Sequence, residues 1–392
     1  MRPPEFNLNK ADKMISSSSR KGLLPAGLSD ILYPDARIQA KTIENLLDVF
    51  SNYGYMRVKP PLVEYEDSLL SDGPGAVLKD STFRIMDPLS QRMMALRSDV
   101  TAQISRIAST RLSHLPRPLR LSYSGDVLRV KGDSFNAERQ KTQVGAELIG
   151  PKSELIDSEI ILVCLQSLKS INIRNITVDL NLPFLRDFFL DGIENSLKEK
   201  INEAIDRKDS QTLKKLKFNN LDIILKFMEC TGNYENGIKK LSELKLDGIL
   251  LEAREYLLKV INIIKENDSS INISIDPLEN RGFKYHTGLT FTIFSEMFKG
   301  EIVKGGSYNT LSGETATGCT IYTEKFNSSP VSYEKNDLVY IPYLNMMEAD
   351  KVIKKGFSVV FGSNLKNNFD KEATELKCKY IWKNNTIVKL KY

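Results

Sequence analysis

The feature that most constrains the fold is a pair of strand-like segments between residues 121 and 150, joined by a polar loop. On the second segment Gln143, Gly145 and Glu147 recur at every second position, so in a strand an amide, a bare backbone and a carboxylate share one face. The first segment ends at Arg129, whose planar guanidinium suits phosphate or carboxylate. The pattern predicts a small polar ligand pocket on a two-stranded hairpin. A hairpin whose polar residues simply face solvent is the alternative that this stretch leaves open.

The composition is that of an ordinary folded protein, with 41% hydrophobic and 27% charged residues among 392. Such a chain is long enough for two or three domains with a sizeable core. The sequence contains no apolar run of about 18 residues, and its first 22 residues lack the apolar core of a secretory signal. Four distant cysteines and two histidines indicate neither a disulfide framework nor a metal site. We therefore expect a cytoplasmic protein that has no membrane segment and needs no cofactor.

The net charge of +5 is concentrated near the C-terminus. Residues 334–392 contain eleven Lys, no Arg and seven acidic residues, which gives +4. Proteins that bind nucleic acid usually carry a clustered basic stripe, often with Arg. Because lysine is frequent throughout this chain, a solvated lysine surface is favoured over a nucleic-acid-binding face. We expect no tRNA partner.

Changes in pattern divide the chain into three parts. Residues 1–22, with a serine run, predict a disordered tail. Residues 23–330 alternate strand and helix signals and predict a core domain, in which 191–268 reads as a helical insertion. Residues 334–392 read as strand, helix, strand, helix and a closing hairpin, which predicts a small C-terminal α/β domain. The fold class expected is therefore α+β.

Local patterns predict particular elements of the core. Apolar residues within 35–53 recur on one helical face, and Gly54 supplies a helix stop. A strand over 55–65 is interrupted by Pro60 and Pro61, which lack backbone donors and suit an edge or an interface. Two strands around a turn at 87–91 precede a helix starting at Val100. Gly305 and Gly306 predict a tight turn after a short strand.

Six phrases carry a family resemblance, in a fixed order between residues 23 and 326. They read LPAGLSDILYPDA, VKPPLVEYEDSL, ALRSDVT, YSGDVLR with QVGAELIG, RGFKYHTGLTF and KGGSYNTL. The set resembles the catalytic core of histidyl-tRNA synthetases. More closely it resembles their paralogue, the regulatory subunit of ATP phosphoribosyltransferase, the first enzyme of histidine biosynthesis. The resemblance implies a class II synthetase-like antiparallel sheet of six or seven strands flanked by helices.

The resemblance also implies a pocket for an amino acid. In the synthetases the ligand is held by three sets of residues. They are a carboxylate in the motif that corresponds to ALRSDVT here, a Gln and a Glu on the second hairpin strand, and an aromatic pair. Carboxylates bind an α-ammonium by charge-assisted hydrogen bonds, and an amide and a phenol can satisfy imidazole nitrogens. Here Asp99 is one methylene shorter than the synthetase Glu, and His286 stands where a plain aromatic would be. The expected ligand-binding residues are Asp99, Thr101, Arg129, Gln143, Glu147, Arg281, Tyr285 and His286.

The residues that bind the nucleotide in synthetases are changed. Where synthetases have Arg-x-Glu, this chain has Arg129, Val130 and Lys131, so a base replaces the acid. Their Gly-x-Glu-Arg motif corresponds to residues 322–325, Tyr-Thr-Glu-Lys, in which a tyrosine fills space that a nucleotide needs. The GGRYD phrase is GGSYN. A salt-bridged surface role is favoured for Arg281 over a phosphate contact. We expect no adenylate formation and no catalytic residue.

Together these features predict a non-catalytic regulatory subunit. By resemblance it would form a homodimer core, with the helix at 35–53 and the Pro60-Pro61 strand at the two-fold interface. It would assemble with the short-form catalytic chain of ATP phosphoribosyltransferase and relay feedback from histidine. Two alternatives remain. One is a divergent or working histidyl-tRNA synthetase, whose usual anticodon-binding domain is longer than the C-terminal segment here. The other is a free amino-acid sensor or scaffold.

Overall fold

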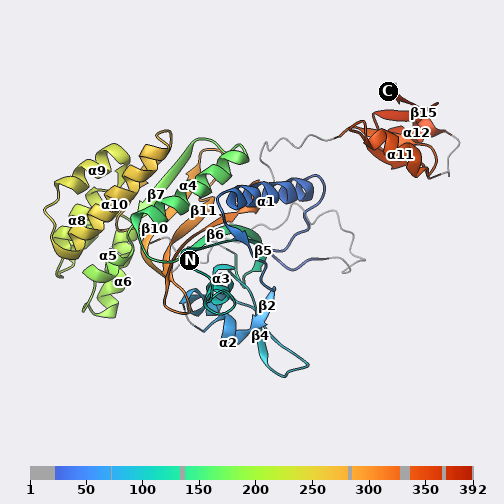
Figure 1. The fold of residues 1–392 in the computed structure, drawn as a ribbon. Helices are drawn as coiled ribbons and strands as arrows, with labels where there is room; N and C mark the ends of the chain where they lie inside the picture. Colours follow the sequence, from blue (N-terminus) through green and yellow to red (C-terminus); the bar gives the residue numbers. More distant parts are fainter. Residues whose placement is uncertain are drawn as a thin grey trace, which may run out of the picture. The chain divides into compact units, whose positions relative to one another are not determined.

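A large sheet forms the centre of the first part of the protein (Figure 1). The computed structural model describes residues 23–71, 73–132, 137–280, 285–326, 336–363 and 368–390, so the expected tail and Arg281 lie outside the described residues. Contacts divide the chain into two compact units, Met1–Val331 and Ser332–Tyr392.

The main sheet is antiparallel at its centre and mixed at its edges. Within the described residues it has nine strands in the order β1-β5-β6-β12-β11-β10-β7-β9-β8. The run from β5 to β7 is antiparallel throughout, whereas β1 pairs with β5 and β9 pairs with β7 in parallel. The strands are β1 (Met56–Arg57), β5 (Leu119–Leu128), β6 (Gln140–Ile149), β7 (Ile176–Asn181), β8 (Gly232–Asn233), β9 (Asn272–Ile275), β10 (His286–Ser295), β11 (Val303–Asn309) and β12 (Thr315–Tyr322). The predicted sheet flanked by helices is confirmed, although it is larger and less uniform than expected.

Alternation along β6 separates the two faces of this sheet. Val144, Ala146 and Leu148 belong to the main apolar core, which they share with α1 (Asp35–Asn52), α4 (Glu154–Ser170) and α10 (Gly248–Asn267). The polar residues between them face the opposite side. There α3 (Thr101–Ser109) packs with β5 in a smaller apolar cluster, and Figure 1 shows α3 on the other side of the sheet from α1 and α4. The polar pocket therefore lies on the α3 side.

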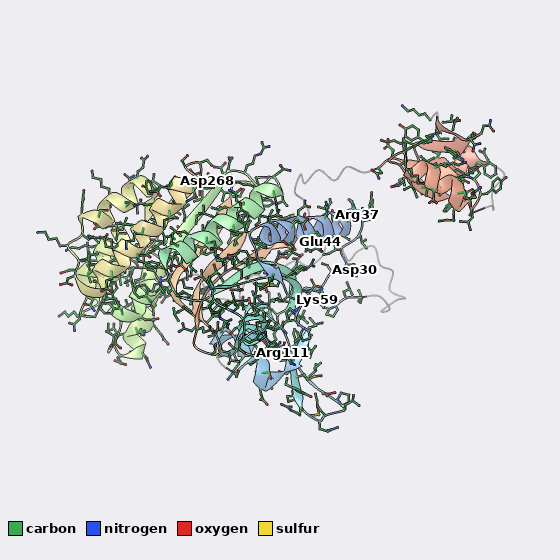
Figure 2. The ribbon with its side chains drawn as sticks, viewed as in Figure 1. Asp30, Arg37, Glu44, Lys59, Arg111 and Asp268 are labelled. Carbon is green, nitrogen blue, oxygen red and sulfur yellow. The ribbon has the colours of Figure 1, made fainter. Side chains whose placement is uncertain are left out.

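The helix α1 forms where the apolar periodicity predicted it. Leu46, Leu47 and Phe50 are buried, and each such side chain contributes about 1.5–3 kcal/mol when removed from water. Figure 2 shows Arg37 and Glu44 on the same helix, and both are exposed. The helix ends before Gly54, whose φ of 82° is a left-handed conformation that favours glycine.

A group of helices follows β7 along the chain. The shorter ones are α5 (Phe184–Phe189), α6 (Asn195–Asp206), α7 (Ser210–Lys215), α8 (Leu221–Glu229) and α9 (Tyr234–Glu243). Their buried residues, Phe189, Ile205 and Phe227 among them, belong to the same apolar cluster as the sheet. The helical group is thus joined to the sheet by a continuous core. No helix in the described part of the chain is long and apolar enough to cross a membrane.

A second, three-stranded sheet lies beside α3, with the order β2-β4-β3. It comprises β2 (Val63–Tyr65), β3 (Arg84–Met86) and β4 (Met93–Leu96), and it is accompanied by α2 (Glu66–Leu69) and the 3-10 helix η2 (Gly73–Ser81). The predicted strand over 55–65 is interrupted at Pro60 and Pro61 as expected, but its two parts are separate strands, because the chain leaves β1 before the prolines and enters a different sheet after them. The carbonyl oxygens of both prolines accept hydrogen bonds from buried Arg97, at 3.1 and 3.4 Å. These interactions take the place of a strand ladder.

The expected tight turn at Gly305 and Gly306 is wrong, because both residues lie inside β11. A Cβ at Gly305 would overlap the ring of Phe291 on β10, and one at Gly306 would lie 2.8 Å from the carbonyl oxygen of Leu289. The glycines therefore permit close approach of neighbouring strands, which is the other common reason for glycine in a strand.

The C-terminal unit has the predicted order of elements. Its sheet runs β14-β13-β15-β16, from β13 (Leu338–Ile341), β14 (Ser358–Phe361), β15 (Tyr380–Lys383) and β16 (Thr386–Lys389), with helices α11 (Met346–Ile353) and α12 (Phe369–Glu375). Val339 and Trp382 pack with α11 on one face, and Tyr340 and Ile381 pack with α12 on the other. The last hairpin turns at Asn384 and Asn385, both at positive φ, as a two-residue hairpin loop requires.

Candidate ligand-binding site

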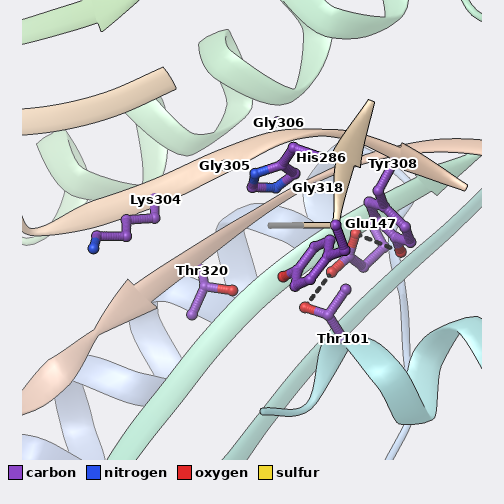
Figure 3. Close-up of a pocket in the computed structure, with 10 residues that line it drawn as sticks. Thr101, Glu147, His286, Lys304, Gly305, Gly306, Tyr308, Gly318 and Thr320 are labelled. Atoms are coloured by element: carbon purple, nitrogen blue, oxygen red, sulfur yellow. Dashed lines mark hydrogen bonds between the residues drawn. The ribbon is translucent and has the colours of Figure 1, made fainter. Parts of the chain in front are cut away.

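The candidate site lies on the α3 side of the main sheet, where β6, β11 and β12 run side by side (Figure 3). Gln143 and Glu147 on β6 are both buried, and Gly145 lies between them on the same face. A Cβ at Gly145 would overlap the ring of Tyr123 on β5. The Gln-x-Gly-x-Glu spacing therefore makes room for a tyrosine from the neighbouring strand.

Glu147 is the buried acid at the centre of the site. It accepts hydrogen bonds from Thr101 Oγ1 at 3.1 Å and from Tyr308 Oη at 3.0 Å (Figure 3). In the ladder between β6 and β12, Glu147 pairs with Gly318. A Cβ at Gly318 would overlap the Glu147 carboxylate. Burial raises the pKa of Glu147 to about 8, and the nearby Asp99 adds to this rise against the two hydrogen bonds. A ligand that carries positive charge would favour the ionised carboxylate, so Glu147 would release its proton to solvent as such a ligand binds.

Asp99 and Gln143 bind one another next to Glu147. Gln143 Nε2 donates to Asp99 Oδ2 at 3.0 Å, and its Oε1 accepts from the backbone N–H of Val100 at 2.9 Å. Asp99 Oδ1 also accepts from the N–H of Thr101 at 2.9 Å. Arg129 Nη2 lies 3.9 Å from Asp99 Oδ2, so an ion pair closes this end of the site. These groups hold the first turn of α3 against β6.

Aromatic residues line the other side of the site. The ring centroid of Tyr285 lies 4.8 Å from that of His286 and 5.8 Å from that of Tyr308. Burial, together with the nearby Lys304, lowers the pKa of His286 to about 3. Its imidazole is therefore neutral at physiological pH and can serve as a hydrogen-bonding wall without adding charge.

The space between these residues is small. It measures about 10 Å³, which is room for about one water molecule. The polar side chains of the site bond one another, and a ligand of amino-acid size would have to displace some of them. The residues that line this space are Thr101, Glu147, Tyr285, His286, Lys304, Gly305, Gly306, Tyr308, Gly318 and Thr320.

The residues at synthetase nucleotide positions have other partners. Lys325 Nζ donates to the carbonyl oxygen of Lys299 at 3.3 Å and also to that of Glu301. Tyr322 is 6% exposed and lies under Lys141, whose Nζ is 5.5 Å from its ring centroid. Ser307 points to the opposite face of the sheet, where it bonds Asp157. The lysine that replaces the motif's arginine is thus occupied by backbone carbonyls.

The structure brings together most of the predicted residues. Asp99, Thr101, Gln143 and Glu147 form one hydrogen-bonded group. Arg129 lies at its edge, and Tyr285 and His286 form a wall. Arg281 lies outside the described residues. The site also includes Tyr123, Lys304, Tyr308, Gly318 and Thr320, which were not predicted, although alternation along the KGGSYN and ATGCTIY segments places the last four on the pocket face.

No group of three or more His, Cys, Asp or Glu side chains that could hold a metal ion occurs within the described ranges. The chemistry available is hydrogen bonding and charge: two buried carboxylates, an amide, phenols and a neutral imidazole. Such a set can recognise a small zwitterion or cation.

Comparison with known proteins first defines the class. The histidyl-tRNA synthetase family model matches residues 27–326. The fold is shared with the crystal structure of an ATP phosphoribosyltransferase regulatory subunit/histidyl-tRNA synthetase from Bacillus halodurans, at a TM-score of 0.77 and 19% identity, covering 91% of this chain and 97% of that one. It is also shared with a chain of the ATP phosphoribosyl transferase complex from Thermotoga maritima, at a TM-score of 0.58 and 19% identity, covering 73% and 97%. The chain is a class II, histidyl-tRNA synthetase-like protein.

Sequence identity to curated relatives then shows which family within this class the chain belongs to. The ATP phosphoribosyltransferase regulatory subunit of Rhodospirillum centenum is 42% identical over 78% of this chain and 80% of its own. That of Gluconobacter oxydans is 36% identical over 94% of this chain and 98% of its own. The chain therefore belongs to the family of ATP phosphoribosyltransferase regulatory subunits.

Proposed function

We propose that this protein is a non-catalytic subunit that assembles with a separate catalytic ATP phosphoribosyltransferase chain and regulates the first step of histidine biosynthesis. The observation that carries the proposal is the 42% identity to a relative named as the regulatory subunit of that enzyme. The Thermotoga maritima complex, whose chain shares this fold, supports assembly with a catalytic partner. Distant cysteines without motif spacing support a cytoplasmic setting.

Histidine is the ligand that we assign to the Glu147 site. The carboxylates of Asp99 and Glu147 suit its α-ammonium, while the amide of Gln143 and the phenols of Tyr285 and Tyr308 suit its imidazole. Binding would replace the hydrogen bonds that Glu147 now accepts from Thr101 and Tyr308. Feedback then requires that the two states of the assembly bind histidine with different affinity.

Loss of synthetase chemistry is supported at the nucleotide end of the site. Lys325, at the arginine position of the Gly-x-Glu-Arg motif, donates to backbone carbonyl oxygens. Tyr322 is buried at the glycine position of the same motif. Lys131 is an exposed base at the acid position of the Arg-x-Glu motif. A lysine also lacks the planar, stacking guanidinium of the motif's arginine. We infer that the chain neither adenylates histidine nor charges tRNA.

A homodimer is supported by apolar residues exposed around α1. They lie just before the helix, at its C-terminal end, on β1 and in the segment that follows. Exposed apolar side chains that gather along neighbouring segments are typical of an interaction site, and a second copy of the chain is the occupant that we propose. The residues are Leu23, Leu24, Ile31, Leu32, Tyr33, Tyr53, Met56 and Leu62.

One experiment tests the function as a whole. The full chain is purified with and without the catalytic partner, and phosphoribosyl transfer to ATP, aminoacylation and inhibition by histidine are measured side by side. We expect transfer only with both chains and no aminoacylation. Histidine-dependent charging of tRNA would instead favour a divergent synthetase, and a lack of any effect on the partner would favour a free sensor.

Glu147→Gln separates assembly from sensing in the same assay. We expect it to activate the partner as well as wild type but to lose inhibition by histidine. Glu266→Gln is the matched control, since Glu266 is exposed on α10 and does not line the site. Equal inhibition of wild type and Glu147→Gln would place the effector site elsewhere.

A further inference from the structure

A second buried carboxylate, Asp157 on α4, lies on the face of the sheet opposite the Glu147 site. It is 1% exposed. Its Oδ1 accepts from Thr317 Oγ1 at 2.6 Å and from Ser307 Oγ at 3.1 Å, and its Oδ2 accepts from Tyr256 Oη at 2.8 Å. These hydroxyls come from β12, β11 and α10. One carboxylate thus joins four elements that are distant in sequence.

The register of β11 and β12 places this cluster directly behind the pocket. Ser307 and Thr317 are opposite one another in the ladder, and the residues that follow them are Tyr308 and Gly318. Because side chains alternate across a sheet, these following residues face the other side. There Tyr308 donates to Glu147 and Gly318 leaves the space that the Glu147 carboxylate fills. The same two strand segments therefore carry Asp157 on one face and support Glu147 on the other.

Tyr256 ties this arrangement to the helical group. It projects from α10, and it lines a cleft of about 340 Å³ together with Lys152, Leu182, Ala253 and Leu289. Its hydroxyl is the contribution of α10 to the Asp157 cluster. A shift of α10 would therefore change one of the hydrogen bonds that hold the backs of β11 and β12.

We propose that Asp157 is a positioning residue for the Glu147 site and that Tyr256 makes this positioning depend on α10. Asp157 holds Ser307 and Thr317, and this fixes the strand segments that present Tyr308 and Gly318 to Glu147. The inference rests on the proposed function only in that histidine is the ligand whose binding is measured. Neither Asp157 nor Tyr256 lines the space of the pocket, so any effect on ligand must pass through the strands.

Tyr256→Phe is the sharper variant, because it removes one hydroxyl and keeps the ring in the core. We expect it to weaken histidine binding to the full chain by about three- to tenfold in calorimetry, within the range that coupled neighbours transmit. Asp157→Asn should weaken binding more. The matched control is Tyr234→Phe on α9, whose ring lies under Lys265 and whose hydroxyl has no hydrogen-bond partner in the described part of the chain.

A double-mutant cycle and a titration distinguish positioning from general loosening. In the double variant Tyr256→Phe with Tyr308→Phe, we expect little loss of affinity beyond that of Tyr308→Phe alone, because Tyr256 acts on the ligand through the placement of the Tyr308 hydroxyl. Multiplicative losses would overturn the inference. Independently of any ligand, carbon NMR of the Glu147 carboxyl should show its titration moved to higher pH in Tyr256→Phe and Asp157→Asn.

The two measurements also separate the inference from the proposed function. If wild type binds no histidine while the Glu147 titration moves in both variants, the ligand assignment fails and the positioning role stands. If wild type binds histidine while affinity and titration are unchanged in Tyr256→Phe and Asp157→Asn, the positioning role is overturned and the proposed function stands.

Discussion

Two buried carboxylates on opposite faces of the same strands have different surroundings. Asp157 accepts from three hydroxyls, two of them on one oxygen. Glu147 accepts one hydrogen bond on each oxygen, borders a small space and lies near a second acid. Burial raises the pKa of both groups, and for Glu147 the value reaches about 8.

The difference indicates two roles for the same chemical group. A buried carboxylate that is fully hydrogen-bonded holds structure, since removing it leaves its donors unsatisfied. A buried carboxylate with spare acceptor capacity beside a space remains costly until a ligand completes it. Asp157 matches the first description and Glu147 the second. Stability should therefore depend more on Asp157 than on Glu147, and binding should depend more on Glu147.

The largest effect expected is on stability, from Asp157→Ala. The hydroxyls of Ser307, Thr317 and Tyr256 would lose their shared acceptor, at a cost of about 3 kcal/mol or more in the free energy of unfolding. Denaturant unfolding followed by circular dichroism measures this, and Asp48→Ala on the exposed side of α1 is the control. A loss equal to that of the control would mean that the Asp157 cluster contributes no structural stability.

Glu147→Gln should change ligand binding much more than stability, the opposite of Asp157→Ala. The amide resembles the protonated acid that predominates below pH 8, so we expect the free energy of unfolding to change by less than about 1 kcal/mol. Histidine binding should weaken about thirtyfold or more, because truncating one partner of a buried charged pair costs about 2 kcal/mol at least. Calorimetry on the full chain checks this. Strong destabilisation with unchanged binding would assign Glu147 to structure.

The pH dependence of stability provides a third test. Because the folded-state pKa of Glu147 is raised to about 8, the folded protein holds a proton that the unfolded chain releases near its ordinary pKa. Its contribution is full at low pH and is lost as pH rises towards 8, by up to about 1.4 kcal/mol per pH unit. Glu324, whose pKa is raised to about 7 by burial, acts in the same direction. The free energy of unfolding is measured against pH for wild type and Glu147→Gln, and the difference between the two curves isolates the contribution of Glu147. Parallel curves would contradict a raised pKa of Glu147 in the folded protein.

Sequence alone predicted the Glu147 side of this comparison and missed the Asp157 side. Gln143 and Glu147 stand out because a period of two puts polar residues on one face of a strand. Asp157 lies in ELIDSEIILVCL, where one acid in an apolar helix carries no sign of its partners. Its donors come from residues 99 to 160 positions further along the chain, so only the assembled fold reveals the cluster.

The same limit explains the errors in the fold. Gly305 and Gly306 have the composition of a turn, and only the neighbouring strand shows why glycine is needed there. The two prolines after β1 correctly indicated a break in hydrogen bonding, but which sheet the chain enters next depends on Arg97 and Gln103 from distant segments. Local elements with strong periodicity, such as α1 and the C-terminal unit, needed no such information.

The smallest effect expected is from Lys152→Met. Lys152 is exposed, yet its charge lowers the pKa of Asp157 against the larger effect of burial. Solvent screens such a charge, so its removal should change the free energy of unfolding by less than about 0.5 kcal/mol. Denaturant unfolding at low and high salt measures it, with Lys259→Met as the control on α10, where Lys259 pairs with Glu154 at 3.1 Å. A loss that exceeds 1.5 kcal/mol and shrinks with salt would mean that a surface cation, not the three hydroxyls, holds the charge of Asp157. The contrast with Glu147 would then rest on electrostatics instead of hydrogen bonding.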